Sequence, residues 1–298
     1  MLLLTMVYEG EQDIISEISQ IKRYFKEKNI VIGISESITA NTHFLKIFCS
    51  DDDYNDKVVN LFNLYMANIL YKVVISQYYH IEMYNFLSDT YFFLKNEEIK
   101  EVGDLCIIAL KGDGAIIDEG SVYCINRKND VLDKIIQCIK EFKEINIDGF
   151  IRFRMKKLRE DLEKIVDKVV EKYMIEKEYT EFIKLLKYFV EVQESKIDEI
   201  NIIIESNDKF LIKDKNGRDI MDDFLCELSE NRIIENENIE DIIISGLITN
   251  CPKIIRIHKA ENCDNKELLE TIKNVFNDRV EFCSSCKLCN KIKEKIKL

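Results

Sequence analysis

The sequence has few of the residues on which catalytic sites most often depend. Its 298 residues include three histidines, His43, His80 and His258, and no tryptophan. It has no P-loop, no Gly-x-Gly-x-x-Gly run, no His-Glu-x-x-His helix and no EF-hand loop. So few histidines give no basis for a Ser-His-Asp or Cys-His set. We therefore expect a binding or structural protein, and an enzyme is the less favoured interpretation.

Proline is also scarce, and the chain has no linker-like composition. Pro252 is the single proline, and no stretch rich in proline, glycine or serine separates one region from another. A chain of 298 residues is long enough for two or three domains. From changes in pattern alone we expect three parts, which cover residues 1–145, 146–197 and 198–298.

Long apolar runs and an excess of positive charge are both missing. The longest apolar run, YMANILYKVVIS, is interrupted by Lys72, and the opening MLLLTMVYEG is too short for a signal peptide. The chain has 43 basic and 55 acidic residues, a net charge of −12. Such a chain repels phosphate overall, so nucleic-acid binding would need a local basic patch. We expect a soluble, cytoplasmic protein that has no membrane partner.

The N-terminal part mixes strand and helix patterns. Alternating and continuous apolar runs predict strands, and apolar residues three or four positions apart predict helices. We expect strands at 2–8, 31–37 and 43–50, helices at 11–28, 54–94 and 130–143, and strands or a loop near 106–126.

The central part has the clearest helical pattern. Six apolar residues repeat at steps of three and four: Ile151, Met155, Leu158, Leu162, Ile165 and Val169. A second helix, about 176–194, is expected to bury Phe182, Leu185, Leu186, Phe189 and Val190. A short polar link joins the two, so we expect an antiparallel helix pair.

The C-terminal part returns to an α/β pattern. INIIIES, KFLIKD, KIIRIH and RVEFC predict strands, and MDDFLCELSE, IEDIIISGLITN and NKELLETIKNVFN predict helices. The strand, helix and strand from 253 to 283 form a βαβ unit, whose two strands should be parallel. The predicted fold class is α+β: an N-terminal α/β and helical region, a central antiparallel helix pair, and a C-terminal α/β unit that ends in a cysteine cluster.

Cysteine, by contrast, is abundant, with ten residues. In a reducing compartment, closely spaced cysteines indicate metal or redox chemistry rather than disulfides. Cys283, Cys286 and Cys289 form the run CSSCKLC near the C-terminus. A Cys-x-x-Cys turn brings two thiolates to a separation that suits one metal ion, about 2.3 Å from each sulfur to zinc. The run therefore predicts a zinc site.

The βαβ unit suggests the remaining ligand of this site. Its parallel strands end at one edge of the sheet, where His258, the following loop with Cys263 and the cysteine run should meet. Cys263 or His258 would complete a tetrahedral set. Cys251 precedes the first strand, so we expect it at the opposite edge and exclude it.

Two alternatives to zinc stay open. Cys-x-x-Cys-x-x-Cys is also part of the ferredoxin-type run, which would make the site an iron–sulfur cluster of a redox protein. That run continues with a fourth cysteine followed by proline, and the residues after Cys289 supply neither. The plainer alternative is three reduced thiols that hold no metal. Zinc is the favoured assignment, and iron–sulfur is less favoured.

A basic stretch in the central part is a second candidate site. RFRMKKLR holds five cations in eight residues, and Arg152, Lys156 and Arg159 share one helical face. An anion or a nucleic acid could bind there. The favoured interpretation is a solvated face balanced by nearby acidic residues. Nucleic-acid binding is thus a less favoured alternative that stays open.

Several long segments resemble a known family. They are GFIRFRMKKL, EKEYTEFIKLLKYFVEVQESKIDEINIII, FLIKDKNGRDI, IEDIIISGLITNCPKIIRIH and FNDRVEFCSSCKLC. Together they resemble the YtxC-like family of spore-forming Firmicutes. The resemblance implies a cytoplasmic sporulation protein of unassigned biochemical activity, and it supplies neither a substrate nor catalytic residues. The partner stays open: a protein partner during sporulation is one alternative, and a nucleic acid is a less favoured one. We expect a non-enzymatic, sporulation-associated protein with a structural zinc site.

Overall fold

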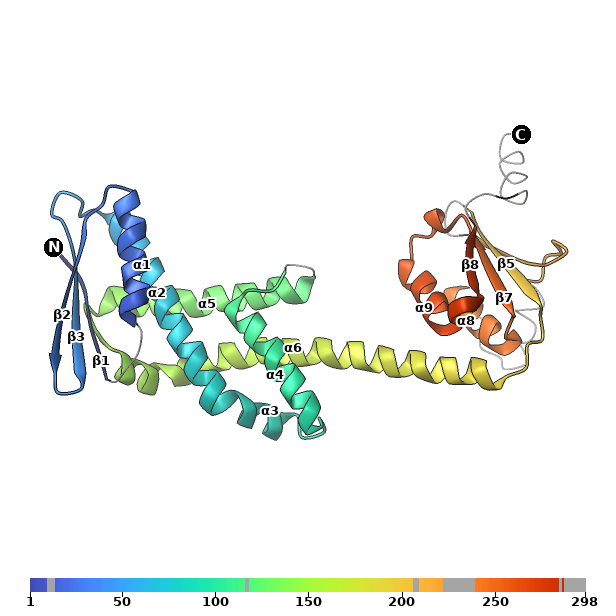
Figure 1. Cartoon of the computed structure of the whole chain (residues 1–298), viewed down its shortest axis with the longest axis horizontal. Coiled ribbons are helices and arrows are strands. Elements are labelled where there is room, and N and C mark those ends of the chain that lie inside the picture. The colour runs from blue at the N-terminus through green and yellow to red at the C-terminus, as the bar shows by residue number, and fades with distance from the viewer. Residues whose placement is uncertain (10–13, 116–117, 206–208, 222–238, 284–285, 287–298) are drawn as a thin grey trace. The chain divides into compact units, whose positions relative to one another are not determined.

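A computed structural model describes residues 1–9, 14–115, 118–205, 209–221, 239–283 and 286, with only the backbone of Met155 (Figure 1). The chain forms two compact units, Met1–Ile175 and Glu176–Leu298. The described strands form one four-stranded sheet in each unit. Helices and strands occur together in both, which confirms the α+β class.

The sheet of the first unit has the strand order β2-β3-β1-β4. β1 (Leu2–Glu9) pairs antiparallel with β3 (Thr42–Cys49), and β3 pairs antiparallel with β2 (Ile32–Thr39). The short β4 (Glu144–Asn146) joins the other side of β1 in parallel. β1 is central and almost entirely buried, which explains its continuous apolar sequence. The three strands expected from the sequence are thus confirmed.

Helices complete the core of the first unit. α1 (Ile14–Glu27) buries Ile14, Ile18, Ile21 and Phe25, which lie on one face of the helix. The others are α2 (Asp56–Tyr78), the π-helix η1 (Tyr79–Met83), α3 (Tyr84–Thr90), α4 (Asn96–Lys111) and α5 (Glu119–Glu141). Asn55 begins α2, where its side-chain oxygen accepts hydrogen bonds from the amides of Lys57 and Val58.

One helical segment, Asp56–Thr90, is long and apolar enough to cross a membrane by length and composition, which the sequence did not lead us to expect. In this structure 56% of its most apolar window is buried inside the protein. Phe62, Met66, Leu70 and Val74 pack in the core of the first unit. The segment therefore has the environment of a core helix of a soluble protein.

The described residues of 106–126 form no strand, and the expected loop is limited to the connection between the helices α4 and α5. CIIAL belongs to α4, because Val102, Cys106 and Leu110 continue a four-residue repeat and are buried. Gly112 ends this helix with a left-handed φ of 73°. Asp118 then begins α5 by accepting a hydrogen bond from the amide of Ser121. The Gly-Asp-Gly run thus separates two helices.

The expected antiparallel pair of helices is not formed. α6 is one helix that runs from Ile147 to Val192. The link near 173–177, YMIEK, contains neither glycine nor proline, and its Met, Glu and Lys residues favour helix, so nothing ends the helix there. Leu158, Leu162 and Ile165 are buried as expected.

The second half of α6 buries only part of the expected apolar set: Leu186 and Val190 are buried as expected, and Phe182, Leu185 and Phe189 are exposed. Ile183, Leu186 and Val190 pack in the core of the second unit. Phe182 and Leu185 are exposed by 51% and 52%, because the expected partner helix does not lie against them. The two units divide between Ile175 and Glu176, inside α6, whereas the sequence led us to expect divisions near 145 and 198.

The sheet of the second unit has the strand order β6-β5-β7-β8. Its strands are β5 (Glu199–Glu205), β6 (Lys209–Asp214), β7 (Ile254–His258) and β8 (Val280–Cys283). β6 is antiparallel to β5, and β5, β7 and β8 are mutually parallel. All four strands were expected. MDDFLCELSE lies almost wholly outside the described residues.

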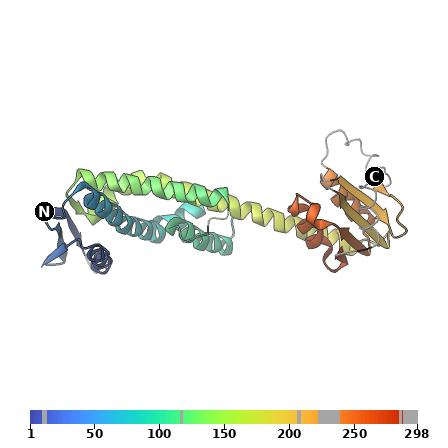
Figure 2. The ribbon, with the colours of Figure 1, turned by 90° about the horizontal axis from the view of Figure 1, so that it is seen from above.

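Two described helices, α8 (Ile239–Asn250) and α9 (Lys266–Phe276), pack on this sheet. α9 joins β7 to β8 between two short 3-10 turns, η2 (Ala260–Asn262) and η3 (Asn277–Arg279). The turned view separates the helices from the strands of this unit (Figure 2). The predicted βαβ unit is confirmed, and it brings the carboxyl ends of β7 and β8 to one edge of the sheet.

Candidate functional site

The candidate metal centre lies at the carboxyl ends of β7 and β8. The register pairs His258 with Cys283 directly across the two parallel strands. Paired residues on neighbouring strands present their side chains to the same face of a sheet. Ile255 and Ile257 alternate with His258 and fill the core face, so His258 and Cys283 belong to the opposite face. The sequence alternation of β7 therefore fixes where the imidazole points.

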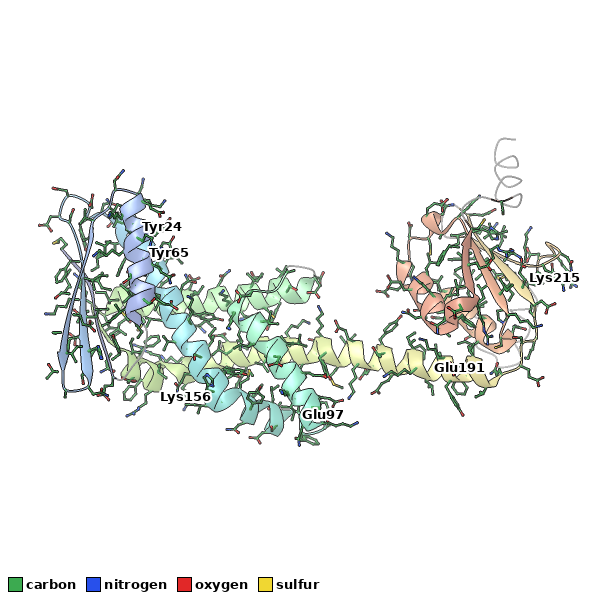
Figure 3. All side chains as sticks on the ribbon, viewed as in Figure 1. Tyr24, Tyr65, Glu97, Lys156, Glu191 and Lys215 are labelled. Atoms are coloured by element: carbon green, nitrogen blue, oxygen red, sulfur yellow. The ribbon has the colours of Figure 1, made fainter. Side chains whose placement is uncertain are left out.

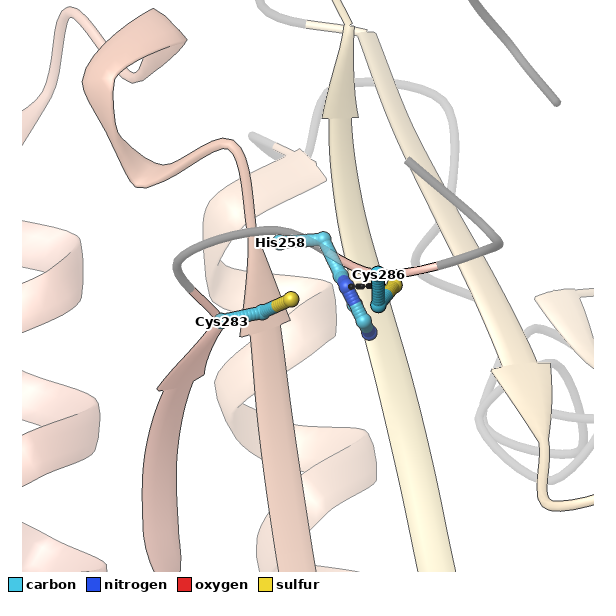
Figure 4. Close-up of side chains that lie close together, drawn as sticks. All are labelled: His258, Cys283 and Cys286. Carbon is cyan, nitrogen blue, oxygen red and sulfur yellow. Dashed lines mark hydrogen bonds between the residues drawn. The ribbon is translucent and has the colours of Figure 1, made fainter. Parts of the chain in front are cut away.

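Three ligand-type side chains meet at this edge: His258, Cys283 and Cys286. Their ligand atoms all lie within 4.8 Å of one another. The Sγ atom of Cys286 is 3.5 Å from the Nδ1 atom of His258 (Figure 4). Ligand atoms in a tetrahedral zinc site are separated by about 3.8 Å when each is about 2.3 Å from the metal. The three groups thus need to move by about 1 Å or less each to bind one ion.

The tautomer of His258 is set by a buried neighbour. Its Nε2 atom is 2.9 Å from the Oδ1 atom of Asn201, and the two side chains are 1% and 3% exposed. The amide nitrogen of Asn201 donates to a Glu199 carboxylate oxygen at 3.0 Å and faces the carbonyl oxygen of Asp214 at 3.4 Å. Both of those partners can only accept, so Oδ1 must face the imidazole. His258 therefore donates from Nε2 and presents the lone pair of Nδ1 to the thiols.

A chain of ion pairs holds Asn201 in this orientation. Glu199 accepts a hydrogen bond from Arg256 at 2.8 Å, and Arg256 also donates twice to Glu281, at 2.8 and 3.1 Å. These residues come from β5, β7 and β8 and occupy the same face of the sheet as His258. Metal-binding histidines commonly donate their second ring N–H to such a fixed acceptor.

The electrostatic environment keeps the imidazole neutral. Burial lowers the pKa of His258 below its ordinary value, and the nearby Arg256 guanidinium lowers it further, while Glu199 acts in the opposite direction. A neutral imidazole is the form that binds a metal ion. With two thiols, it supplies a borderline-soft N and S donor set that suits zinc.

The other expected ligands have different positions. Cys263 is not in the described group of ligand atoms, and its buried thiol donates to the carbonyl oxygen of Asn265 at 3.1 Å. Cys289 lies outside the described residues. Cys251 precedes β7, as expected, and its thiol is 3.2 Å from the carbonyl oxygen of Val190.

Asn201 and Glu199 are residues of this site that the sequence did not identify. Their contribution depends on the register of β5 against β7, which pairs Asn201 with Arg256. The available signal was a lone asparagine inside the apolar run INIII. A polar residue in a central parallel strand is unusual and needs a hydrogen-bond partner.

The basic candidate residues lie in the first unit. Arg152, Lys156 and Arg159 line one cavity of about 500 Å³, and Lys156 is labelled in Figure 3. Arg159 is paired with Glu163 at 2.7 Å and with Glu82 at 3.3 Å. The helical spacing of the three cations thus brings them to one surface, as expected.

Comparison with known proteins identifies the family of the chain. The model of the YtxC-like family matches residues 64–281, a range that includes His258 and ends just before Cys283. A Bacillus subtilis (strain 168) protein described as uncharacterized protein YtxC is 22% identical over 219 residues, which cover 73% of this chain and 75% of that protein. No solved structure matches the chain. The chain belongs to the YtxC-like family.

Proposed function

We propose that this protein binds one zinc ion through His258, Cys283 and Cys286, and that the ion has a structural role. In this proposal Cys289 supplies the fourth ligand, because its spacing from Cys286 repeats the Cys-x-x-Cys step. Four protein ligands leave no position for a substrate, so the site is closed and not catalytic. The metal would hold the C-terminal end of the chain against the edge of the second sheet.

The observation that carries the proposal is the orientation of His258. The hydrogen bond to Asn201 directs the Nδ1 lone pair toward Cys286, and Cys283 is the cross-strand partner of His258. In the absence of metal, the same lone pair can accept the thiol proton of Cys286, and zinc would replace that proton. The side chains of His258, Cys283 and Cys286 would therefore need to move little to bind a zinc ion.

The biological setting follows from the family resemblance. We propose that the protein is cytoplasmic and acts during sporulation, with a protein partner and without enzymatic activity of its own. A reducing cytoplasm would keep Cys283 and Cys286 as thiols available to zinc. Metal binding of this kind adds directly to the free energy of folding, so the zinc would stabilise the second unit in particular.

The test is the metal content of protein purified without oxygen. The proposal predicts about one zinc per chain, retained by a Cys138→Ser control and lost from the Cys283→Ser/Cys286→Ser variant. Cys138 is a suitable control because it is half-buried in α5 of the first unit and outside the described ligand group. Iron with inorganic sulfide, or no metal in either protein, would contradict the zinc assignment.

A further inference from the structure

A cavity in the first unit has features of a ligand site that do not involve the cysteines. It has a volume of about 500 Å³ and lies where the end of α2, the π-helix η1 and the beginning of α6 meet. Small-molecule sites commonly measure about 300–1,000 Å³. Its polar lining residues are Gln77, Glu82, Asp148, Arg152, Lys156 and Arg159.

Only some of the charged side chains that line the cavity have a partner within the protein. Arg159 is held by Glu163 and Glu82, and Asp148 accepts a hydrogen bond from the backbone amide of Glu9 at 3.2 Å. Arg152 and Lys156 make no ion pair with any carboxylate of the described chain. They are one helical turn apart on α6, where like charges repel each other. An anion bound between them would relieve that repulsion.

The π-helix supplies a second, independent observation. π-helical turns are uncommon and frequently occur at functional sites. Tyr78, the residue before η1, is fully buried, and its hydroxyl has no hydrogen-bond partner in the described part of the protein. Its charged neighbours include Glu163, Arg159 and Glu82. Glu82, a residue of η1 that lines the cavity, likewise has a buried carboxylate oxygen, Oε2, without a hydrogen bond to the described residues. A buried polar atom without a partner is costly, and a donor group on a ligand in the cavity would supply one.

We propose that this cavity binds a small phosphorylated molecule. Arg152 and Lys156 would hold the phosphate, and Gln77 would donate to it from α2. Glu82 and Asp148 would accept hydrogen bonds from hydroxyl or amino groups on the rest of the ligand. The carboxylates in the lining, together with the net charge of −12, disfavour a long nucleic-acid backbone and favour a compact ligand.

Calorimetry on the full chain tests the proposal, with inorganic pyrophosphate and adenosine 5′-monophosphate as probes at constant ionic strength. The wild type is expected to bind at least one of the two saturably, at one site. The variant Arg152→Gln/Lys156→Gln is expected to bind at least tenfold more weakly. The control Lys164→Gln/Lys184→Gln removes the same charge from two exposed α6 positions outside the cavity lining and should bind as the wild type does.

A further variant distinguishes binding of the probe inside this cavity from nonspecific electrostatic attraction to the protein surface. Glu82→Gln removes a negative charge from the cavity lining and one of the two carboxylate partners of Arg159, so this variant should bind pyrophosphate several-fold more tightly than the wild type does. Thermal unfolding curves confirm that each variant is folded. The proposal is overturned if neither probe binds saturably, if the two double variants lose affinity equally, or if oligonucleotides bind through Arg152 and Lys156 while both small probes do not.

Discussion

The Nδ1 atom of His258 lies 3.5 Å from the Sγ atom of Cys286, while its Nε2 atom is hydrogen-bonded to Asn201. One ring nitrogen, Nε2, thus forms a hydrogen bond within the protein, and the other, Nδ1, is directed at a thiol. The arrangement has the order found around metal-binding histidines: a fixed acceptor, the imidazole, then the metal position.

Asn201 is predicted to tune zinc binding without touching the metal. Asn201→Ala removes the acceptor that fixes the tautomer of His258, so the zinc affinity should fall about 10–100-fold. Competition with a chromophoric chelator measures this affinity. Asn262→Ala, an equivalent change elsewhere in the second unit, should have no effect, and an equal loss there would argue against a specific role for Asn201.

Removal of the metal is predicted to loosen only part of the protein. After chelation, amide hydrogen exchange should accelerate in β8 and at the end of β7, because the proposed metal–ligand bonds that join His258 to the cysteines are lost. The α2 helix belongs to the core of the first unit and should exchange at its original rate. Hydrogen-exchange mass spectrometry measures both segments in one experiment. Unchanged exchange in β8 would show that no structural metal was removed.

The continuity of α6 has a direct test at Ile175, which is 60% exposed. In a continuous helix, Ile175→Pro removes a backbone hydrogen bond and should lower the free energy of unfolding by about 3 kcal/mol or more. A link between two separate helices would tolerate proline there. Ile175→Ala is the control and should change the stability by less than about 0.5 kcal/mol. Denaturant unfolding followed by circular dichroism measures both.

Asp198 is predicted to contribute to stability in a pH-dependent way. Lys215 and Lys253 each lie 2.9 Å from its carboxylate, and mainly the hydrogen bond from Lys215 lowers the pKa of Asp198 to about 2. A folded-state pKa below the unfolded value means that the contribution is present above pH 4 or so and is lost as the pH falls toward about 2. The wild type should therefore be slightly more stable than Asp198→Asn at pH 6. The difference should vanish near pH 2, and a difference that grew on acidification would contradict this account.

Much of the architecture was predictable because its elements carry strong local patterns. β1, β2, β3, α1 and the βαβ unit were all expected from apolar periodicity. The two errors have identifiable causes. CIIAL is a short apolar run, which periodicity alone cannot assign to strand or helix. The four-residue spacing of the buried Val102, Cys106 and Leu110 shows that it belongs to a helix. The break expected near 173–177 had no glycine or proline to produce it.

The candidate metal site was predictable only in part. The proximity of His258 to the cysteine run follows from the parallel crossover, whose handedness is nearly invariant. The contribution of Asn201 depends on the register of β5, which no local pattern specifies. Likewise, Glu82 reaches the basic cavity from a π-helix, and a single extra residue in a helical turn leaves no clear signal in the sequence.

X-ray absorption at the zinc edge of the anaerobically purified protein tests the central claim most directly. The account predicts a first shell of three sulfur atoms at about 2.3 Å and one nitrogen at about 2.0 Å, with the nitrogen lost in His258→Ala. A shell of oxygen and nitrogen alone, or a spectrum that His258→Ala leaves unchanged, would contradict the assignment of His258 and the cysteines as ligands.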